Sequence, residues 1–164
     1  MDIALARIDD RLIHGQIVTA WVQDTKASEL IVADDKAAND EMQKMMLKLA
    51  TPGSMKLSIL SIAEAAKKFS EDQSDTKVLL LLRNPGTALE LINAGVEIPK
   101  INVGNISNSR SLTGRKKILM YIYLEEADAK NLEELIRQGV ELDVRSVPTD
   151  KSMDGQTLIS KYFE

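Results

Sequence analysis

The sequence predicts an α/β fold, a single domain over residues 1–164 built on an open, mostly parallel, twisted sheet with helices on both faces. Short apolar runs alternate with amphipathic, helix-period segments from one end of the chain to the other. Most of these runs are apolar at successive positions, as in strands that are buried on both faces of a parallel sheet. A chain of 164 residues, 44% of them hydrophobic, can bury one sizeable core and is short for two independent domains.

Each predicted element follows from its local pattern. Strands are expected at residues 2–8, 29–33, 56–60, 77–82, 100–104, 118–124 and 141–147. Helices are expected at residues 15–21, 41–49, 62–69, 88–93 and 132–137. Ser61 and Glu64 have the spacing of a capping box, and Gly95 and Gly139 stand where a left-handed residue ends a helix.

Composition excludes several classes of function. The formal net charge of −4 argues against a general nucleic-acid binder, which needs surplus cations to neutralise phosphates. There is no cysteine, so disulfides, thiolate metal sites and cysteine nucleophiles are excluded. The first residues lack a signal-peptide pattern, and the run VLLLL is too short to span a bilayer, so we expect a cytoplasmic protein.

Ligands of such open sheets bind at the carboxyl ends of the strands. The residues expected there are 7–15, Asp34, Asp35, Arg83, Asn84, Gly104, Asn105 and 148–150. For Gly104 we favour a tight turn after the strand. The basic run GRKK at 114–117 is interpreted as a solvated loop, and the methionines of 42–46 as core or helix-surface residues.

The chain's one histidine lies in the first of these loops, in the stretch RIDDRLIHGQIVTAW. If Gly15 and Gln16 open a helix, His14 sits beside free backbone N–H groups at the positive end of a helix dipole, which is an anion site. Arg11 and Arg7 offer two-pronged donors to phosphate oxygens, and Gly15 permits the close approach of an anion. Imidazole is a nucleophile near neutral pH, so the pattern indicates phosphoryl transfer through phosphohistidine.

Other roles for these residues remain open. A lone histidine is more often a satisfied surface or core residue than a catalyst. Asp9 and Asp10 either orient the imidazole by accepting its second N–H or stabilise the turn, and the turn is the simpler interpretation. A metal site of His14 with Asp34 and Asp35 is a weak alternative because ligand spacing is absent.

The segment ARIDDRLIHGQIVTAW resembles the active-site segment of the IIB component of the mannose, fructose and sorbose class of bacterial sugar phosphotransferase systems. The stretches VADD, NPG, INVGN and DVRSVPTD occur in similar order in that family, so the resemblance covers nearly the whole chain. Many mannose-type members have a second glycine where this chain has Asn105, which leaves mannose, fructose, sorbose and N-acetylgalactosamine open as the sugar.

The resemblance implies a phosphotransferase. Its chemistry requires no cofactor, and the sequence leaves magnesium open. His14 would accept a phosphoryl group from phosphorylated IIA and pass it to a sugar presented by the membrane components IIC and IID, with Arg11 stabilising the phosphate. The candidates for the phosphate site or the pocket around it are Arg7, Asp9, Asp10, Gly15, Gln16, Asp34, Asp35, Arg83, Asn84 and Asn105. No nucleic-acid partner is expected, and a homo-oligomer is allowed.

Two rival functions use the same residues. A phosphatase or phosphomutase would form phosphohistidine on a free small molecule and would need an acid for the leaving group, for which the first loop offers only Asp9 and Asp10. A phosphate or nucleotide sensor would hold its ligand with Arg11 and the helix start, without covalent chemistry.

Overall fold

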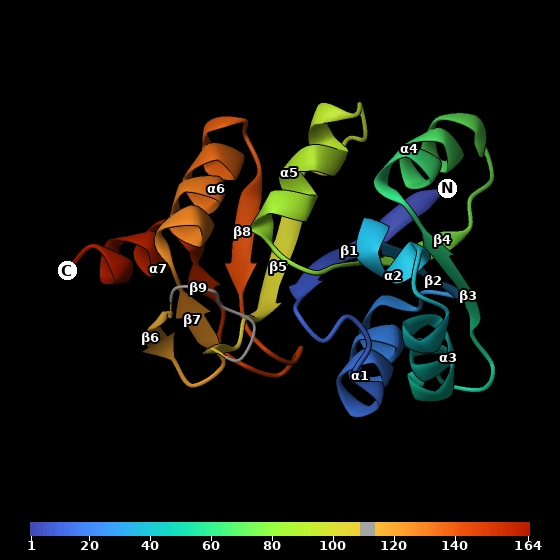
Figure 1. Ribbon diagram of the computed structural model, residues 1–164, viewed down its shortest axis with the longest axis horizontal. Helices are drawn as coiled ribbons and strands as arrows, with labels where there is room; N and C mark the ends of the chain where they lie inside the picture. Colours follow the sequence, from blue (N-terminus) through green and yellow to red (C-terminus); the bar gives the residue numbers. More distant parts are fainter. Residues whose placement is uncertain (109–113) are drawn as a thin grey trace.

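The computed structural model describes residues 1–108 and 114–164 and confirms the predicted fold class. A seven-stranded sheet runs in the order β3-β2-β4-β1-β5-β8-β9, and every neighbouring pair is parallel except β8 with β9 (Figure 1). The strands are β1 (Asp2–Asp9), β2 (Glu29–Ala33), β3 (Lys56–Leu60), β4 (Lys77–Leu82), β5 (Lys100–Asn105), β8 (Glu141–Val144) and β9 (Met153–Asp154).

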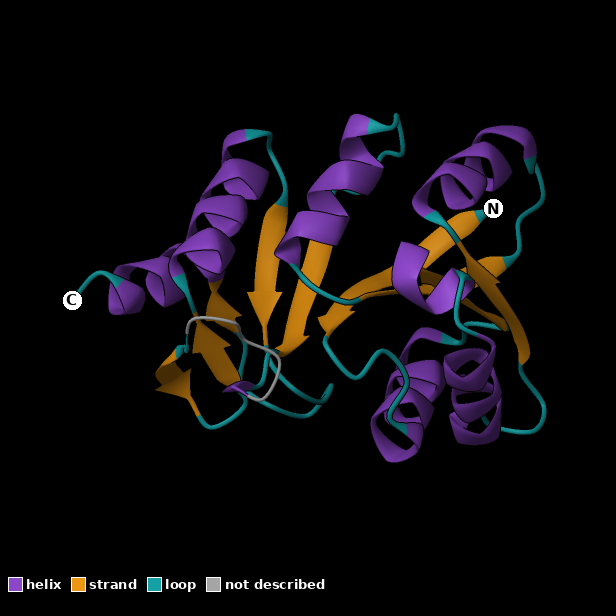
Figure 2. Ribbon diagram, viewed as in Figure 1, coloured by secondary structure: helices purple, strands orange, loops and turns teal. Residues whose placement is uncertain are grey.

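Helices cover both faces of this sheet, as Figures 1 and 2 show. The helices of the described residues are α1 (Gly15–Thr25), α2 (Asp35–Ala38), α3 (Glu41–Ala50), α4 (Ile62–Glu71), α5 (Pro85–Asn93), α6 (Glu126–Arg137) and α7 (Gly155–Tyr162). Buried side chains of α1, α2 and α3 belong to one hydrophobic cluster, and buried side chains from each of α4 to α7 belong to another. The sheet therefore separates two cores.

The central strands explain this division. In β2, Leu30 and Val32 pack in the cluster with α1 and α3, whereas Ile31 and Ala33 pack in the cluster with α4 and α5. Successive side chains of a strand point to opposite faces, so a strand between two helix layers must be apolar at every position. The continuous apolar runs in the sequence have this origin.

Two predicted strands differ from the structure. Residues 118–124 form no single strand, because the chain reverses at Met120 and Tyr121 between β6 (Lys116–Leu119) and β7 (Ile122–Leu124) of a separate antiparallel pair. The strand expected at 141–147 ends at Val144. Beyond it, the N–H groups of Ser146 and Val147 donate to the carboxylate of Asp150 rather than to a neighbouring strand.

Helix boundaries follow local capping. The Ser61–Glu64 capping box is present, and Gly95 and Gly139 adopt the left-handed conformation, with φ of 104° and 91°. Helix α5 begins at Pro85, earlier than predicted, because Asn84 caps it. Helix α6 also begins earlier, behind a capping box of its own. Helices α2 and α7 and strand β9 were not predicted; each is short, and α2 has a single turn.

The sheet topology places the first loop in a crevice. The chain leaves β1 toward β2 on one side of the sheet, and it leaves β5 toward β8 on the other. Neighbouring strands whose connections diverge in this way leave a crevice at their carboxyl ends, where ligands of open α/β sheets bind. The loop between β1 and α1 lies at this point.

Candidate functional site

The loop between β1 and α1 is held in one conformation by its own residues. The Oδ1 of Asp9 accepts a hydrogen bond from the backbone N–H of Arg11 at 3.0 Å, and the N–H of Leu12 donates to the Asp9 carbonyl at 2.9 Å. Leu12 takes the left-handed conformation, with φ of 62°, which is unfavourable for a branched side chain. Leu12 and Ile13 are both buried in the core, and this burial offsets the backbone strain.

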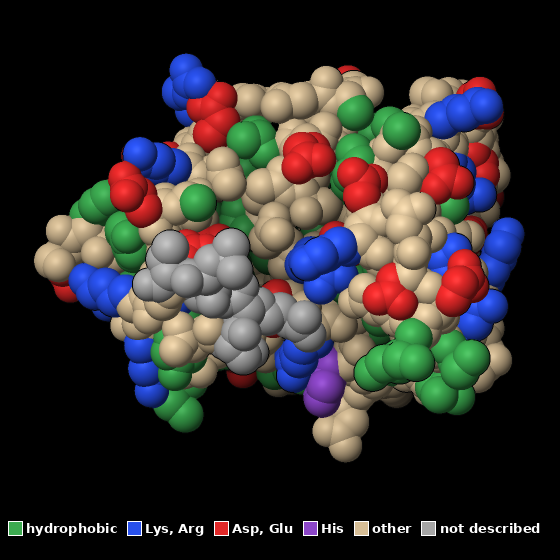
Figure 3. All heavy atoms as spheres, in the orientation of Figure 1, with side chains coloured by type: hydrophobic (Ala, Val, Ile, Leu, Met, Phe, Trp, Pro, Cys, Tyr) green, Lys and Arg blue, Asp and Glu red, His purple; other side chains and the backbone are tan. Residues whose placement is uncertain are grey.

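His14 follows as the N-cap residue of α1. Its backbone is extended and its carbonyl accepts from the N–H of Val18 at 2.9 Å, but its imidazole makes no capping bond. The side chain therefore does not occupy the first N–H groups of this 11-residue helix, and these groups have no partner among the described residues, so they can bind an anion. His14 is partly exposed and is the purple side chain of Figure 3.

Neither acidic residue of the loop orients the imidazole. The Nδ1 of His14 is buried and has no hydrogen-bond partner among the described residues. Asp10 accepts instead from the Nδ2 of Asn105 at 3.0 Å and from the backbone N–H and the hydroxyl of Ser107, both at 2.8 Å. Asp9 binds Arg7 and Arg11. Both carboxylates therefore stabilise the turn, and neither of them accepts a hydrogen bond from the His14 imidazole.

Arg11 is presented to the surface by a two-pronged bond. Its Nε and Nη2 donate to the two carboxylate oxygens of Asp9, both at 3.2 Å. The side chain is still 37% exposed, and its Nη1 has no partner among the described residues. A guanidinium fixed on one side and free on the other suits a phosphate group that arrives from solvent.

Arg7 does not share this exposure. It is fully buried, donating from Nη1 to Asn102 Oδ1 at 2.7 Å and to the Ser146 carbonyl at 2.9 Å, and from Nη2 to Asp9 Oδ2 at 3.1 Å. Burial lowers the pKa of the Arg7 guanidinium, and the charge of Asp9 opposes that shift. Arg7 is thus unavailable to a phosphate at the surface, contrary to its place among the pocket candidates.

The buried guanidinium explains a glycine that was assigned to a turn. Gly104 lies within β5, not in a turn after it. A Cβ atom at this position would collide with the guanidinium of Arg7. The glycine is needed because the arginine lies directly against the strand backbone, with Trp21 on another side, 5.8 Å from the guanidinium carbon to the ring centre. Gly15 has a similar role, since a Cβ there would stand 3.3 Å from the carbonyl of Ala50 in α3.

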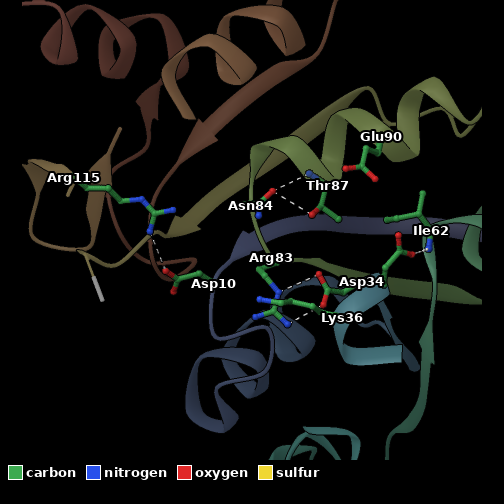
Figure 4. A pocket seen from close by; sticks show the side chains of 10 residues that line it. Asp10, Asp34, Lys36, Ile62, Arg83, Asn84, Thr87, Glu90 and Arg115 are labelled. Atoms are coloured by element: carbon green, nitrogen blue, oxygen red, sulfur yellow. Dashed lines mark hydrogen bonds and ion pairs between the residues drawn. The ribbon is translucent and has the colours of Figure 1, made fainter. Parts of the chain in front are cut away.

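Most of the other candidates line a cavity of about 480 Å³ at the ends of β1, β2 and β4 (Figure 4). Asp34 receives a two-pronged bond from Arg83, at 3.1 and 2.8 Å, and caps α2. Asp35 accepts from the N–H of Ile62 at 2.8 Å. His14, Arg11, Gly15 and Gln16 do not line this cavity, so the structure separates the candidates into two groups. Asp10, in the loop before His14, borders the cavity.

Sequence reasoning missed Arg115. It belongs to the basic run expected to be solvated, yet its side chain is only 6% exposed and donates from Nε to Asp128 Oδ2 at 3.0 Å. Its Nη1 also lies 3.7 Å from Asp10 Oδ2, as Figure 4 shows. Burial raises the pKa of the Asp128 carboxyl, against the effect of the Arg115 charge. No local pattern marks Arg115, because its partners come from distant segments.

The donors around His14 suit an anion. Among the residues that the structure describes, no cluster of three or more histidine or carboxylate side chains could hold a metal ion. In the same part of the chain, no helix is long and apolar enough to cross a bilayer. Backbone N–H groups and a guanidinium beside an imidazole can bind a phosphoryl group and stabilise the charge on its oxygens.

Comparisons with known proteins agree with this chemistry. Residues 3–163 match the family model described as the PTS system sorbose subfamily IIB component. The fructose-specific EIIB component of Bacillus subtilis (strain 168) is 39% identical over 94% of this chain and 93% of that protein. The IIBSor domain of the sorbose permease from Klebsiella pneumoniae superposes with a TM-score of 0.90 at 34% identity, covering 98% of each chain. The mannose-specific EIIAB component of Escherichia coli (strain K12) is 34% identical over 98% of this chain, which spans 49% of that protein.

Proposed function

Because the chain belongs to the sorbose subfamily of IIB components of the sugar phosphotransferase system, we propose that His14 is the residue that carries the phosphoryl group. In this proposal His14 accepts the group from the phosphohistidine of a IIA component and passes it to a sugar held by the membrane components IIC and IID. The observation that supports the assignment is the position of His14, partly exposed at the start of α1. The protein is a phosphotransferase, as its family is.

The transfer is an in-line exchange of one bond for another. The bond from phosphorus to the IIA imidazole breaks while a nitrogen of His14 supplies the electron pair of the new bond. In the second step the bond to His14 breaks and its electron pair returns to the imidazole nitrogen, the sugar hydroxyl oxygen bonds to phosphorus, and the hydroxyl proton passes to the released imidazole. Such transfers depend chiefly on positioning and on stabilising charge at the phosphoryl oxygens. The open N–H groups at the start of α1 and the Nη1 of Arg11 supply that stabilisation.

A phosphatase or phosphomutase is less well supported. Such an enzyme needs an acid near the leaving group, and the first loop offers only Asp9 and Asp10. Both are buried, and each accepts several hydrogen bonds within the turn network. Neither carboxylate is placed to deliver a proton at His14. A sensor would not require a nucleophile at the anion site, where this chain has its one histidine.

The setting of this function is also proposed. The fused relative, whose name joins IIA and IIB in one component, supports IIA as the phosphoryl donor. Transfer to a sugar in IIC and IID places this protein at the cytoplasmic face of the membrane. The sugar is of the mannose, fructose, sorbose or N-acetylgalactosamine type, in line with the different sugars named for the relatives.

Labelling tests the assignment directly. The purified protein is incubated with a phosphorylated IIA component, and the labelled residue is mapped by mass spectrometry under conditions that preserve acid-labile phosphate. We expect one label, on His14, and none on the His14→Ala variant. The variant should keep its melting temperature, because the imidazole makes no capping bond and is not part of the core. Labelling of the variant at the wild-type level would refute the assignment.

A further inference from the structure

One face of helix α3 exposes apolar side chains that none of the described residues covers. Met42, Met45, Met46 and Leu49 are 73%, 64%, 63% and 82% exposed, and together we call them the α3 apolar face. Their spacing of three and four residues places them on one stripe of the helix. Leu47, on the opposite side, is the residue of α3 buried in the core. Of the described residues, the only other large apolar side chains this exposed are Met120 and Phe163.

This face adjoins the start of α1. Gly15, next to His14, lies against the carbonyl of Ala50, the last residue of α3. A shallow hollow spans the two helices and is lined by Gly15, Gln16, Thr19, Ala50, Thr51 and Pro52. In Figure 3 the exposed apolar side chains gather over α3 on the same side of the molecule as the purple imidazole.

The length of α3 bounds the distance between the two features. A helix rises 1.5 Å per residue, so the 10 residues of α3 extend about 15 Å from Ala50, and Leu49 to Met42 lie within that span. A standard protein interface covers about 800 Å² on each partner, equivalent to a disc with a radius of about 16 Å. A protein that docks over His14 therefore covers much of the α3 apolar face.

We propose that the α3 apolar face is the docking surface for the phosphorylated IIA component. The inference rests on the proposed function, in which the donor is a histidine on the surface of another protein. Two protein surfaces must then meet around His14 for the two imidazoles to reach reacting distance. In the second step the sugar is held by IIC and IID, which must also approach His14, so the two partners use the surface around His14 in turn.

The chemistry of the face fits a partner that must leave after each transfer. Four side chains on one helix are too few for the large apolar interface of a permanent dimer. Methionine side chains are flexible and polarizable, and they adapt to a partner without a rigid fit. The exposed Arg11, in the loop before His14, and the exposed Lys48, on α3, add positive charge. The matching surface of IIA should be apolar beside its phosphohistidine, whose negative charge complements these cations.

Transfer kinetics test the proposal with a matched control. The Met45→Lys/Leu49→Lys protein should show an increase of about tenfold or more in the KM for phosphorylated IIA with kcat unchanged, because central apolar contacts dominate such interfaces. Met120→Lys is the matched control and should leave the KM unchanged. Met120 is 82% exposed and lies on the turn between β6 and β7, which Figure 1 shows at the other end of the molecule from α3. Transfer from the phosphorylated double variant to sugar in membrane vesicles is measured in parallel.

Methyl NMR supplies a direct map. With ¹³C-methyl methionine in the wild-type protein, addition of unphosphorylated IIA should shift the signals of Met42, Met45 and Met46 and leave that of Met120 in place. An unchanged KM together with unmoved α3 methyl signals would overturn the proposal. So would a defect confined to the sugar step, which would assign the face to the membrane components, or a dimer that the double variant dissociates in sedimentation. If phosphorylated IIA labels His14 normally in these cases, the docking inference alone fails; if His14 takes no label, the proposed function fails.

Discussion

Adding a single methyl group at Gly104 should destabilise the fold more than most surface substitutions. The Cβ of Gly104→Ala would occupy the space of the Arg7 guanidinium, which must then move away from Asn102, Asp9 and the Ser146 carbonyl. Breaking a buried ion pair costs about 3–5 kcal/mol, and overpacking a core costs about 1–3 kcal/mol. We therefore expect a loss of about 4 kcal/mol in the free energy of unfolding, against a total of about 5–15 kcal/mol for a typical domain.

Thermal and urea unfolding measure this loss. For a domain of this length, about 4 kcal/mol corresponds to a decrease in melting temperature on the order of 10 °C. Gly53→Ala is the matched control, because a Cβ at this exposed glycine meets no atom within 4 Å. In an Arg7→Met background the cost of Gly104→Ala should fall, since the guanidinium is no longer there to be displaced. Equal melting temperatures for Gly104→Ala and Gly53→Ala would refute the steric argument.

Further predictions concern the loop and the ion pairs. Arg11→Lys should lower the rate of phosphoryl acceptance by about tenfold or more, because lysine cannot bind Asp9 and phosphate through separate prongs; equal rates would remove Arg11 from the mechanism. Ser61→Ala should cost about 1 kcal/mol in urea unfolding through the lost capping bond. Hydrogen bonding to Ser61 lowers the pKa of Glu64. The difference in unfolding free energy between the wild-type protein and Glu64→Gln should therefore be present above the unfolded pKa of glutamate and disappear as the pH falls below about 4. A difference that does not change with pH would contradict this. Arg115→Met should cost about 3 kcal/mol by leaving Asp128 buried without its cation, and a neutral result in chemical denaturation would show that water replaces the arginine.

Local patterns were sufficient for much of the fold. Every apolar run of the main parallel sheet from 29–33 to 100–104 became a strand, because burial on two faces requires apolar residues at consecutive positions. Capping also acts within a few residues, so Ser61 with Glu64 and the two C-terminal glycines could be identified without tertiary information. The helix start after His14 belongs to the same class of local signal.

What sequence reasoning missed depends on contacts between distant segments. Nothing near Arg7 shows that Asn102 and the Ser146 carbonyl lie beside it, so an arginine at a strand end suggested exposure. Gly104 was assigned to a turn for the same reason, since its neighbour in space is 97 positions away in the chain. Arg115 finds acids only after α6 and the first loop come together.

The sharing of Asp9 between two arginines sets an electrostatic balance at the start of α1. One carboxylate neutralises only one of the two guanidinium charges, so the cluster of Arg7, Asp9 and Arg11 has one positive charge in excess, while Asp10 lies apart from this cluster beside Arg115. A phosphoryl group on His14 would compensate that excess, and its arrival from IIA would be favourable. The same attraction would oppose its departure to the sugar, so under the proposed function the loop would tune the group-transfer potential of the phosphohistidine. An added positive charge here would speed loading and slow release, whereas loss of Arg11 would shift the balance the other way.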